Sequence, residues 1–205
     1  FIAPYSAKVA EEMSPVVGQT ASYMASFRPE SPLSNLLPDI LLWASPKFGE
    51  NPDFAVYNSG GIRAALPKGD VTVGDVLDVA PFDNKIYFLT LSGEKVMELF
   101  GQIAHRGGEG VSRGVALRIT KDGRLLSASV GGKPVDKNRT YRIATLDYLA
   151  QGNDEMVAFK AKTDVVAPDS ETNNVRFIIM DYFRDCAAQG LKVDSKVEGR
   201  IVVND

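Results

Sequence analysis

The sequence predicts a mixed α/β (α+β) fold, in which residues 1–205 form a single domain with a mixed sheet flanked by helices. Amphipathic stretches with helical spacing alternate along the chain with short apolar runs that are typical of strands. Three strand-like runs follow one another with glycine-containing turns between them, which favours an antiparallel or mixed sheet. The length of 205 residues, with 44% hydrophobic and 24% charged residues, fits one globular domain.

The N-terminal part of the chain is predicted to contain five elements. They are a short helix, an extended segment, a longer helix, a strand and a second short helix, over residues 5–13, 15–27, 31–44, 53–57 and from 71 to 77. The longer helix has apolar residues at helical spacing, Ser31 as its N-cap and Pro32 in its first turn. Pro38 lies inside this helix and cannot donate an interior hydrogen bond, so we expect a kink or a restart there.

The clearest predicted helix follows a β-rich run over residues 85–91 and is capped by Ser92. Its apolar residues fall at i, i+3, i+4, i+7 and i+8 and define one buried stripe: Val96, Leu99, Phe100, Ile103 and Ala104. His105 stands at the C-terminal end of this helix, where a charged imidazole is favourable to the helix dipole. We therefore expect His105 to be a helix-end residue and not a catalyst.

The C-terminal half is predicted to be rich in strands and to close with a helix and a strand. After a glycine-rich loop, the predicted strands are 115–120, 125–130 and 141–147. A helix from Thr172 carries on one face Val175, Ile178, Ile179, Tyr182, Phe183 and Cys186. A last strand is expected over 198–203. These elements complete the single mixed domain.

Composition and charge exclude several classes of function. A net charge of -3 leaves no basic excess, which argues against a nucleic-acid binder. No apolar run approaches the roughly 20 residues that a membrane-spanning helix needs. A single histidine cannot supply the ligand cluster of a zinc or two-metal hydrolytic centre, so we expect no metal site and no catalytic residue in this chain. Since the chain begins at Phe1, we expect a processed or trimmed N-terminus.

Four loops, each following an apolar segment, carry groups suited to a small polar ligand: residues 58–63, 81–84, 107–113 and 148–154. In the first loop, Arg63 offers a planar guanidinium to a phosphate or carboxylate, and Gly60 and Gly61 let backbone N–H groups approach the same ligand. The alternative is a tight turn with a surface arginine, which composition alone favours.

Two aromatic residues lie on separate loops of this set. Phe82 follows a proline, and Tyr148 ends the strand before residues 150–154. Such rings could hold a flat heterocycle between them, while Asp154 and Asn58 hydrogen-bond its hydroxyl and ring-nitrogen groups. The alternative is that both rings fill loop-covered core and that Asp154 caps a local turn.

The loops share an ordered set of motifs with a known family. The motifs are Asn58-Ser59-Gly60-Gly61-Ile62-Arg63, the segment 67–77, Pro81-Phe82-Asp83-Asn84, and the run 141–148 with Gly152-Asn153-Asp154. In this order they resemble the C-terminal substrate-binding domain of the 5′-nucleotidase family, over most of the chain. Several ordered motifs are far more specific than one glycine loop.

The resemblance implies that this domain clamps a nucleoside between two rings, which match Phe82 and Tyr148. It also implies that Asn58 contacts the base, Asp154 the ribose hydroxyls and Arg63 the phosphate. Arg28 lies near the position of another phosphate-binding arginine of the family. The substrate-binding set implied by the resemblance is Asn58, Gly60, Gly61, Arg63, Phe82, Asn84, Tyr148, Gly152, Asp154 and Arg28.

Full-length members of the family pair this domain with an N-terminal metallophosphoesterase domain that holds two divalent metals. The resemblance therefore implies a nucleotide-binding part of a phosphohydrolase that is inactive alone, with its metals on another domain or partner chain, in an extracytoplasmic location. Two alternatives stay open: a stand-alone nucleoside- or nucleotide-binding protein without a catalytic partner, and a scaffold that no longer binds a ligand. This chain departs from the family's usual Gly-Gly-Asp-Gly loop at Asn153 and Glu155, and its ring at Tyr148 is often Phe in the family.

Overall fold

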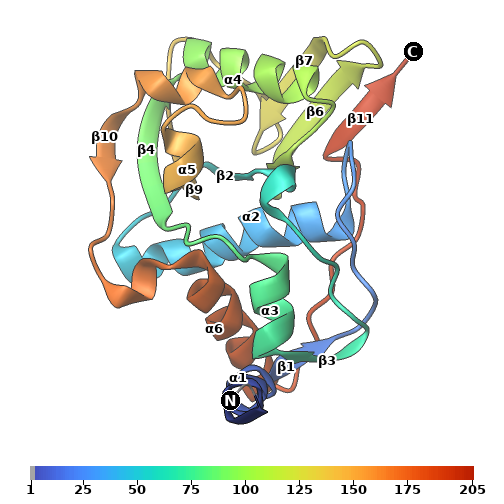
Figure 1. The fold of residues 1–205 in the computed structure, drawn as a ribbon. Helices are drawn as coiled ribbons and strands as arrows, with labels where there is room; N and C mark the ends of the chain where they lie inside the picture. The colour runs from blue at the N-terminus through green and yellow to red at the C-terminus, as the bar shows by residue number, and fades with distance from the viewer. Residues whose placement is uncertain (1–2) are drawn as a thin grey trace.

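The structure is a computed structural model that describes residues 3–205, and it has the mixed α/β architecture that the sequence predicts (Figure 1). The α-helices are α1 (Ala3–Met13), α2 (Pro32–Ala44), α3 (Val73–Val79), α4 (Gly93–His105), α5 (Asp147–Ala150) and α6 (Val175–Ala188). The strands are β1 (Val16–Thr20), β2 (Phe54–Tyr57), β3 (Gly69–Thr72), β4 (Ile86–Ser92), β5 (Gly110–Val111), β6 (Val115–Thr120), β7 (Leu125–Val130), β8 (Lys133–Pro134), β9 (Thr140–Leu146), β10 (Thr163–Val166) and β11 (Ile201–Asn204). Short 3-10 helices are η1 (Ser45–Phe48), η2 (Ser59–Gly61), η3 (Val157–Ala161) and η4 (Glu171–Asn173).

The central sheet has five strands in the order β10-β4-β9-β2-β5. It is mixed, because β2 runs parallel to β9 while the other neighbours pair antiparallel. Every residue of β2 is buried, and both α2 and α4 pack against β9. Because successive residues of a strand point to opposite faces, the complete burial of β2 means that the sheet is covered on both faces.

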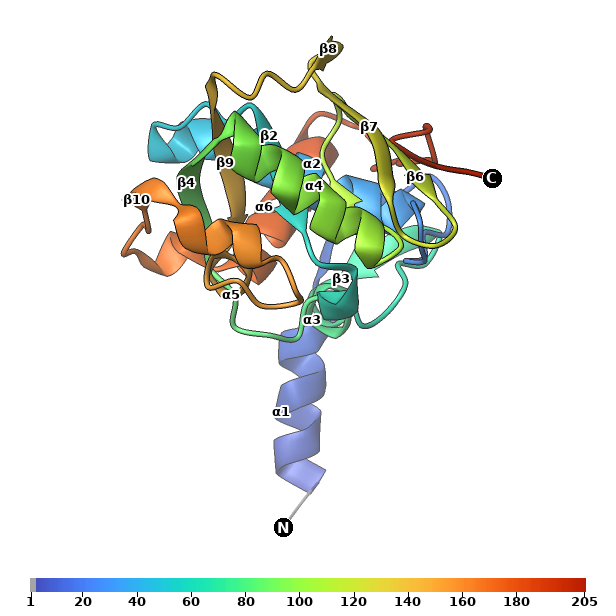
Figure 2. The same cartoon turned by 90° about the horizontal axis from the view of Figure 1, so that it is seen from above.

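Two smaller sheets complete the β-structure, which the sequence predicted as one sheet. One has four strands in the order β11-β6-β7-β8, with β11 parallel to β6, and the other pairs β1 with β3. In β6, buried Val115, Leu117 and Ile119 alternate with exposed residues, so one face of this sheet joins the core. Helix α4 contacts both β4 and β7 and lies between the two larger sheets, while α1 projects away from the rest of the described chain (Figure 2).

Helix α2 begins as predicted but does not restart at Pro38. The hydroxyl of Ser31 accepts a hydrogen bond from the backbone N–H of Ser34, and the Ser34 hydroxyl accepts one from the N-cap backbone, which forms a capping box. Pro38 lies inside the uninterrupted helix and is buried. The carbonyl oxygen of Ser34 has no helical donor, because Pro38 lacks an N–H group. This oxygen lies close to Gly110, and a Cβ added at Gly110 would come within 2.7 Å of it.

The extended segment predicted over residues 15–27 is shorter in the structure. Only Val16–Thr20 forms a strand. Isolated contacts then hold the chain: Ala21 donates its backbone N–H to Val193, Met24 exchanges backbone hydrogen bonds with Leu66, and Ala25 accepts one from Leu33. These partners come from separate parts of the chain. The segment therefore cannot continue as one ladder.

Three predicted boundaries near the C-terminus are also shifted. Strand β9 ends at Leu146, so Tyr148 lies in the one-turn helix α5 and not at a strand end. Helix α6 begins at Val175 and not at Thr172, because Asn174 caps it by accepting a hydrogen bond from the N–H of Arg176. The last strand begins at Ile201 because the preceding chain binds buried Glu30, which accepts hydrogen bonds from the N–H groups of Glu198 and Ile201.

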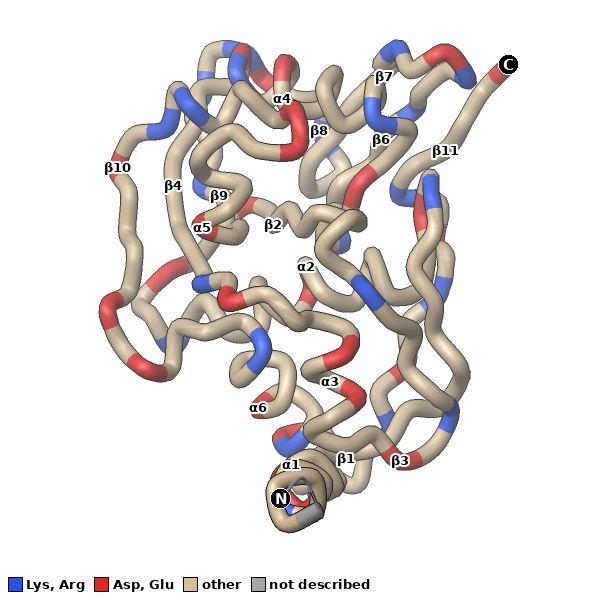
Figure 3. The backbone as a smooth tube through the Cα atoms, viewed as in Figure 1, with Lys and Arg blue, Asp and Glu red and all other residues tan. Residues whose placement is uncertain are grey.

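Lys, Arg, Asp and Glu residues are interspersed along the backbone (Figure 3). Within residues 3–205, no helix combines the length and apolar character needed to cross a bilayer. The same residues contain no group of three or more His, Cys, Asp or Glu side chains arranged to hold a metal ion.

Candidate functional site

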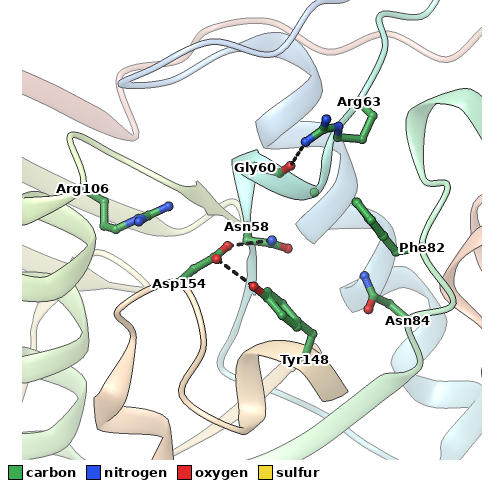
Figure 4. A pocket seen from close by; sticks show the side chains of 9 residues that line it. Asn58, Gly60, Arg63, Phe82, Asn84, Arg106, Tyr148 and Asp154 are labelled. Atoms are coloured by element: carbon green, nitrogen blue, oxygen red, sulfur yellow. Dashed lines mark hydrogen bonds between the residues drawn. The ribbon is translucent and has the colours of Figure 1, made fainter.

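A cavity of about 310 Å³ opens where four separate segments of the chain meet (Figure 4). The segments are the exit of β2 with η2, the loop between α3 and β4, the C-terminal end of α4, and α5 with the loop after it. Its lining residues are Asn58, Gly60, Gly61, Arg63, Phe82, Asn84, Arg106, Tyr148 and Asp154. The structure thus brings together eight of the ten residues that the sequence singled out, and adds Arg106.

The first wall is the turn at the end of β2. Gly61 closes η2 by donating its N–H to the carbonyl oxygen of Asn58, and a Cβ on Gly61 would lie only 3.0 Å from Asn58 Oδ1. A side chain at this position would therefore require Asn58 to shift by a few tenths of an ångström, whereas glycine fits as it is. Arg63 follows the turn, and its guanidinium lies 3.5 Å from the carbonyl oxygen of Gly60. This long contact leaves most of the donors of Arg63 available to a ligand.

Asn58 is almost fully buried, with 4% of its surface exposed, and its amide orientation is fixed on one side only. Its Nδ2 donates a 2.8 Å hydrogen bond to Asp154 Oδ2. Its Oδ1 finds no hydrogen-bond partner among the residues that the structure describes. A buried carbonyl oxygen without a partner is costly, so a small movement of the Asn58 amide that lets this oxygen accept a hydrogen bond from a bound molecule would be favourable.

The two aromatic residues both line the cavity from separate segments. Phe82 is 50% exposed and Tyr148 is 39% exposed, and Figure 4 shows both side chains reaching toward the same space. Exposed fractions of this size are unusual for core aromatic residues. Neither ring therefore serves as a filler of the hydrophobic core, which was the alternative that the sequence left open.

Hydrogen bonds between segments that are distant in the sequence hold the two aromatic residues near each other. Asp147 Oδ1 accepts from the N–H of Tyr148 at 2.9 Å and from the N–H of Lys85 at 3.0 Å, which links the first turn of α5 to the end of the loop that carries Phe82. Arg176 on α6 donates to the carbonyl oxygen of Pro81 at 2.9 Å and holds the other end of that loop.

Asp154 lies at the centre of the polar side of the cavity. Besides Asn58, it accepts a 3.0 Å hydrogen bond from the hydroxyl of Tyr148, and this bond raises the pKa of Tyr148. Both Asp154 and Glu155 have positive φ, 54° and 61°, a conformation that glycine adopts more easily. The carboxylate has further lone pairs, so it can accept hydroxyl groups of a ligand while it keeps its present partners.

Two predicted residues lie outside the cavity lining. Gly152 lies in the turn after α5 with φ of 87°, where it donates its N–H to Leu149. Arg28 donates to the carbonyl oxygen of Gly108 at 2.9 Å and to Glu109 Oε1 at 2.7 Å. In this arrangement Gly152 shapes the loop of Asp154, and Arg28 is tied to a neighbouring buried carboxylate.

Arg106 is the lining residue that sequence reasoning missed. It follows α4 directly, donates from Nε to Glu109 at 3.1 Å, and lies 3.5 Å from Glu155. The only signal in the sequence was its position at the start of the glycine-rich loop, next to the third of the four predicted ligand loops.

The arrangement combines two partly exposed rings, an unpartnered amide oxygen, a carboxylate and two guanidinium groups around one space. It can hold a flat heterocycle, accept hydrogen bonds from hydroxyl groups and pair with an anion. None of the lining residues is a histidine or a cysteine, and Asp154 is the only carboxylate among them.

A family model for the C-terminal domain of 5′-nucleotidase matches residues 9–161. Protein UshA of Yersinia enterocolitica is 34% identical over 117 residues, which is 56% of this chain and 21% of that protein. The trifunctional nucleotide phosphoesterase protein YfkN of Bacillus subtilis is 30% identical over 187 residues, which is 84% of this chain and 12% of that protein. The chain therefore spans only a small part of the length of these relatives.

Solved structures agree with this match. The 5′-nucleotidase precursor of Thermus thermophilus superposes with a TM-score of 0.83 at 26% identity, covering 100% of this chain and 42% of that chain. The NAD nucleotidase of Haemophilus influenzae superposes with a TM-score of 0.74 at 19% identity, covering 99% of this chain and 40% of that chain, a likeness of fold alone.

Proposed function

The chain belongs to the family of 5′-nucleotidase C-terminal domains, and from that premise we propose that its cavity binds a nucleoside 5′-monophosphate or a related nucleotide. The observation that carries the proposal is the meeting of two half-exposed rings, Phe82 and Tyr148, with the carboxylate of Asp154 at one cavity. A volume of about 310 Å³ lies at the lower end of the range of small-molecule sites.

Each part of the nucleotide has a proposed partner. The base stacks between Phe82 and Tyr148, and Asn58 Oδ1 accepts a hydrogen bond from it. Asp154 accepts hydrogen bonds from the ribose hydroxyls, because the carboxylate keeps free lone pairs beside its two protein donors. The guanidinium of Arg63 pairs with the phosphate at the other end of the cavity.

We also propose that residues 1–205 act as the substrate-binding domain of a phosphohydrolase whose metal centre lies on another domain or a partner chain. The described residues hold no ligand cluster that fits divalent metals, so no step of hydrolysis is assigned to them. The part of the reaction left to this chain is to orient the nucleotide and to balance the charge of its phosphate. By the same family resemblance we propose an extracytoplasmic location.

Titration calorimetry of the chain with adenosine and with AMP tests the proposal. We expect both to bind, and AMP to bind more tightly because Arg63 pairs with its phosphate. Binding of neither ligand at millimolar concentration, by a sample whose circular dichroism shows a folded protein, would refute the proposed function.

A second measurement tests the proposed cooperation with a metallophosphoesterase domain. A metallophosphoesterase domain of the family, added to this chain in solution, should hydrolyse AMP faster than it does alone. Binding of AMP without any such stimulation would instead indicate a stand-alone nucleotide-binding protein.

A further inference from the structure

Glu109 is a buried carboxylate next to the cavity. None of the proposed ligand contacts involves it. Its side chain is 0% exposed, and it lies in the loop between α4 and β5. Oε1 accepts from Arg28 at 2.7 Å and from Arg106 Nε at 3.1 Å, while Oε2 accepts from the backbone N–H of Ser59 at 2.5 Å. One carboxylate therefore joins two arginines and the first residue of η2.

The buried charge of Glu109 is compensated by its immediate neighbours. A buried carboxylate is costly unless opposite charges and hydrogen-bond donors compensate it, and here three donors converge on one group. Both arginines remain partly exposed, with 38% of the Arg28 side chain and 24% of the Arg106 side chain accessible. The carboxylate thus anchors each guanidinium from the inside and leaves its outer edge open.

Both anchored parts form walls of the cavity. Ser59 begins the turn that carries Gly60 and Gly61 and leads to Arg63. The hydrogen bond from its N–H to Glu109 therefore fixes the position of this turn relative to Glu109. Arg106 lines the opposite side and reaches Glu155, the residue after Asp154 (Figure 4). A group that fixes both walls at once also sets the distance between them.

We propose that Glu109 is a positioning residue of this cavity: it holds the turn of residues 58–63 and the guanidinium of Arg106 in the arrangement that receives an anionic nucleotide. The inference rests on the proposed function, since it names a supporting residue of the same site. Glu109 acts through its partners, because it is buried beneath them and is not among the lining residues.

The variant Glu109→Gln separates positioning from simple electrostatics. If Glu109 contributed only its negative charge, removing that charge would strengthen the binding of AMP, which is a dianion. A glutamine, however, accepts hydrogen bonds at one atom only and points an NH₂ group at the remaining donors. Positioning therefore predicts weaker AMP binding, by about tenfold, from the loss of charge-assisted hydrogen bonds that orient the walls, and a smaller loss for adenosine.

A matched control is Glu50→Gln. Glu50 is also largely buried and binds Arg142 through both oxygens, at 2.7 and 2.8 Å, but it does not line or support the cavity. We expect this variant to lose stability in thermal unfolding and to keep the wild-type affinity for AMP. A folded Glu109→Gln variant whose AMP affinity equals or exceeds that of the wild type would overturn the inference while leaving the proposed function intact.

If Glu109→Gln does not fold, Arg28→Gln and Arg106→Gln answer the same question. Because both arginines share Oε1 of Glu109, their effects on AMP affinity should be coupled, and the double variant should differ from the product of the single effects by more than about twofold. Independent effects would overturn the inference. Failure of the wild-type chain to bind either adenosine or AMP would instead refute the proposed function itself.

Discussion

Replacement of Phe82 by alanine tests the proposed stacking directly. Phe82 is 50% exposed, so a bound base can still cover about half of a side chain that buries roughly 200 Å² when fully packed. Covering about 100 Å² at about 25 cal/mol per Å² corresponds to about 2.5 kcal/mol, within the roughly 1 to 3 kcal/mol typical of a stacked base. We therefore expect the Kd for adenosine to rise by about tenfold to a hundredfold.

Folding should change much less in this variant. A half-exposed ring at a cavity rim contributes little to the core, so the free energy of unfolding should fall by no more than about 1 kcal/mol. The buried ring of Phe183 is the contrasting case, since its truncation should cost about 3 to 5 kcal/mol. Urea denaturation of the variants measures both changes.

The matched control is Phe177→Ala. Phe177 lies on α6, is 48% exposed and does not line the cavity, so its removal should leave the affinity for adenosine unchanged. Two results of calorimetry and denaturation would refute the stacking argument. One is a folded Phe82→Ala variant with wild-type affinity, and the other is a Phe82→Ala variant that unfolds.

Three further predictions follow from individual contacts. Asp154→Asn should weaken the binding of adenosine by about tenfold and that of 2′,3′-dideoxyadenosine less, because only adenosine also offers ribose hydroxyls to the carboxylate; equal losses in calorimetry would contradict this role. Burial raises the pKa of Tyr57 and raises the pKa of Tyr182 to about 12, whereas an unfolded tyrosine loses its proton near pH 10. The folded state thus holds these protons more tightly, so the contribution of the two tyrosines to the free energy of unfolding should be constant below about pH 10 and be lost from there to about pH 12; a urea midpoint that does not fall over that interval would contradict the assignment. Burial also raises the pKa of the Cys186 thiol, so iodoacetamide at pH 8 should modify it more slowly in the native protein than in denaturant, and equal rates would show that the thiol is accessible and unperturbed.

Local signals in the sequence were sufficient to place the longer helices, α2 and α4. The apolar stripe of the helix after Ser92 is buried at all five predicted positions, and the hydroxyl of Ser92 accepts a hydrogen bond from the N–H of Lys95, as an N-cap should. Spacing and capping are properties of neighbouring residues, so they can be recognised without knowledge of the rest of the fold.

Long-range pairing could not be predicted in the same way. Nothing near residues 201–204 indicates that they pair parallel with β6, or that the β-structure divides into three sheets. The same limit explains the boundary at Tyr148. The N–H groups of Tyr148 and Lys85 meet on the side chain of Asp147, and that meeting of distant segments starts a helical turn where local propensity suggested the end of a strand.

The sequence predicted most of the residues that line the cavity, but not how they are arranged in space. Family motifs named eight of the nine lining residues, because the motifs that carry the resemblance contain these residues. Arg106 escaped because an arginine after a helix is common, and its importance appears only when Glu109 and Glu155 are placed beside it. Arg28 was named because it lies near the position of a phosphate-binding arginine of the family, but in the structure it donates to buried Glu109 and does not line the cavity.

The hydrogen bond between Asn58 and Asp154 joins residues that are 96 positions apart in the chain. A fragment that lacks either residue loses this contact, so occupancy of the complete cavity reports how much of the population has folded completely. By mass action, a nucleotide present at a hundred times its Kd would add about 2.7 kcal/mol to the native state. The melting temperature of this chain should accordingly serve as a sensitive screen for its natural ligand.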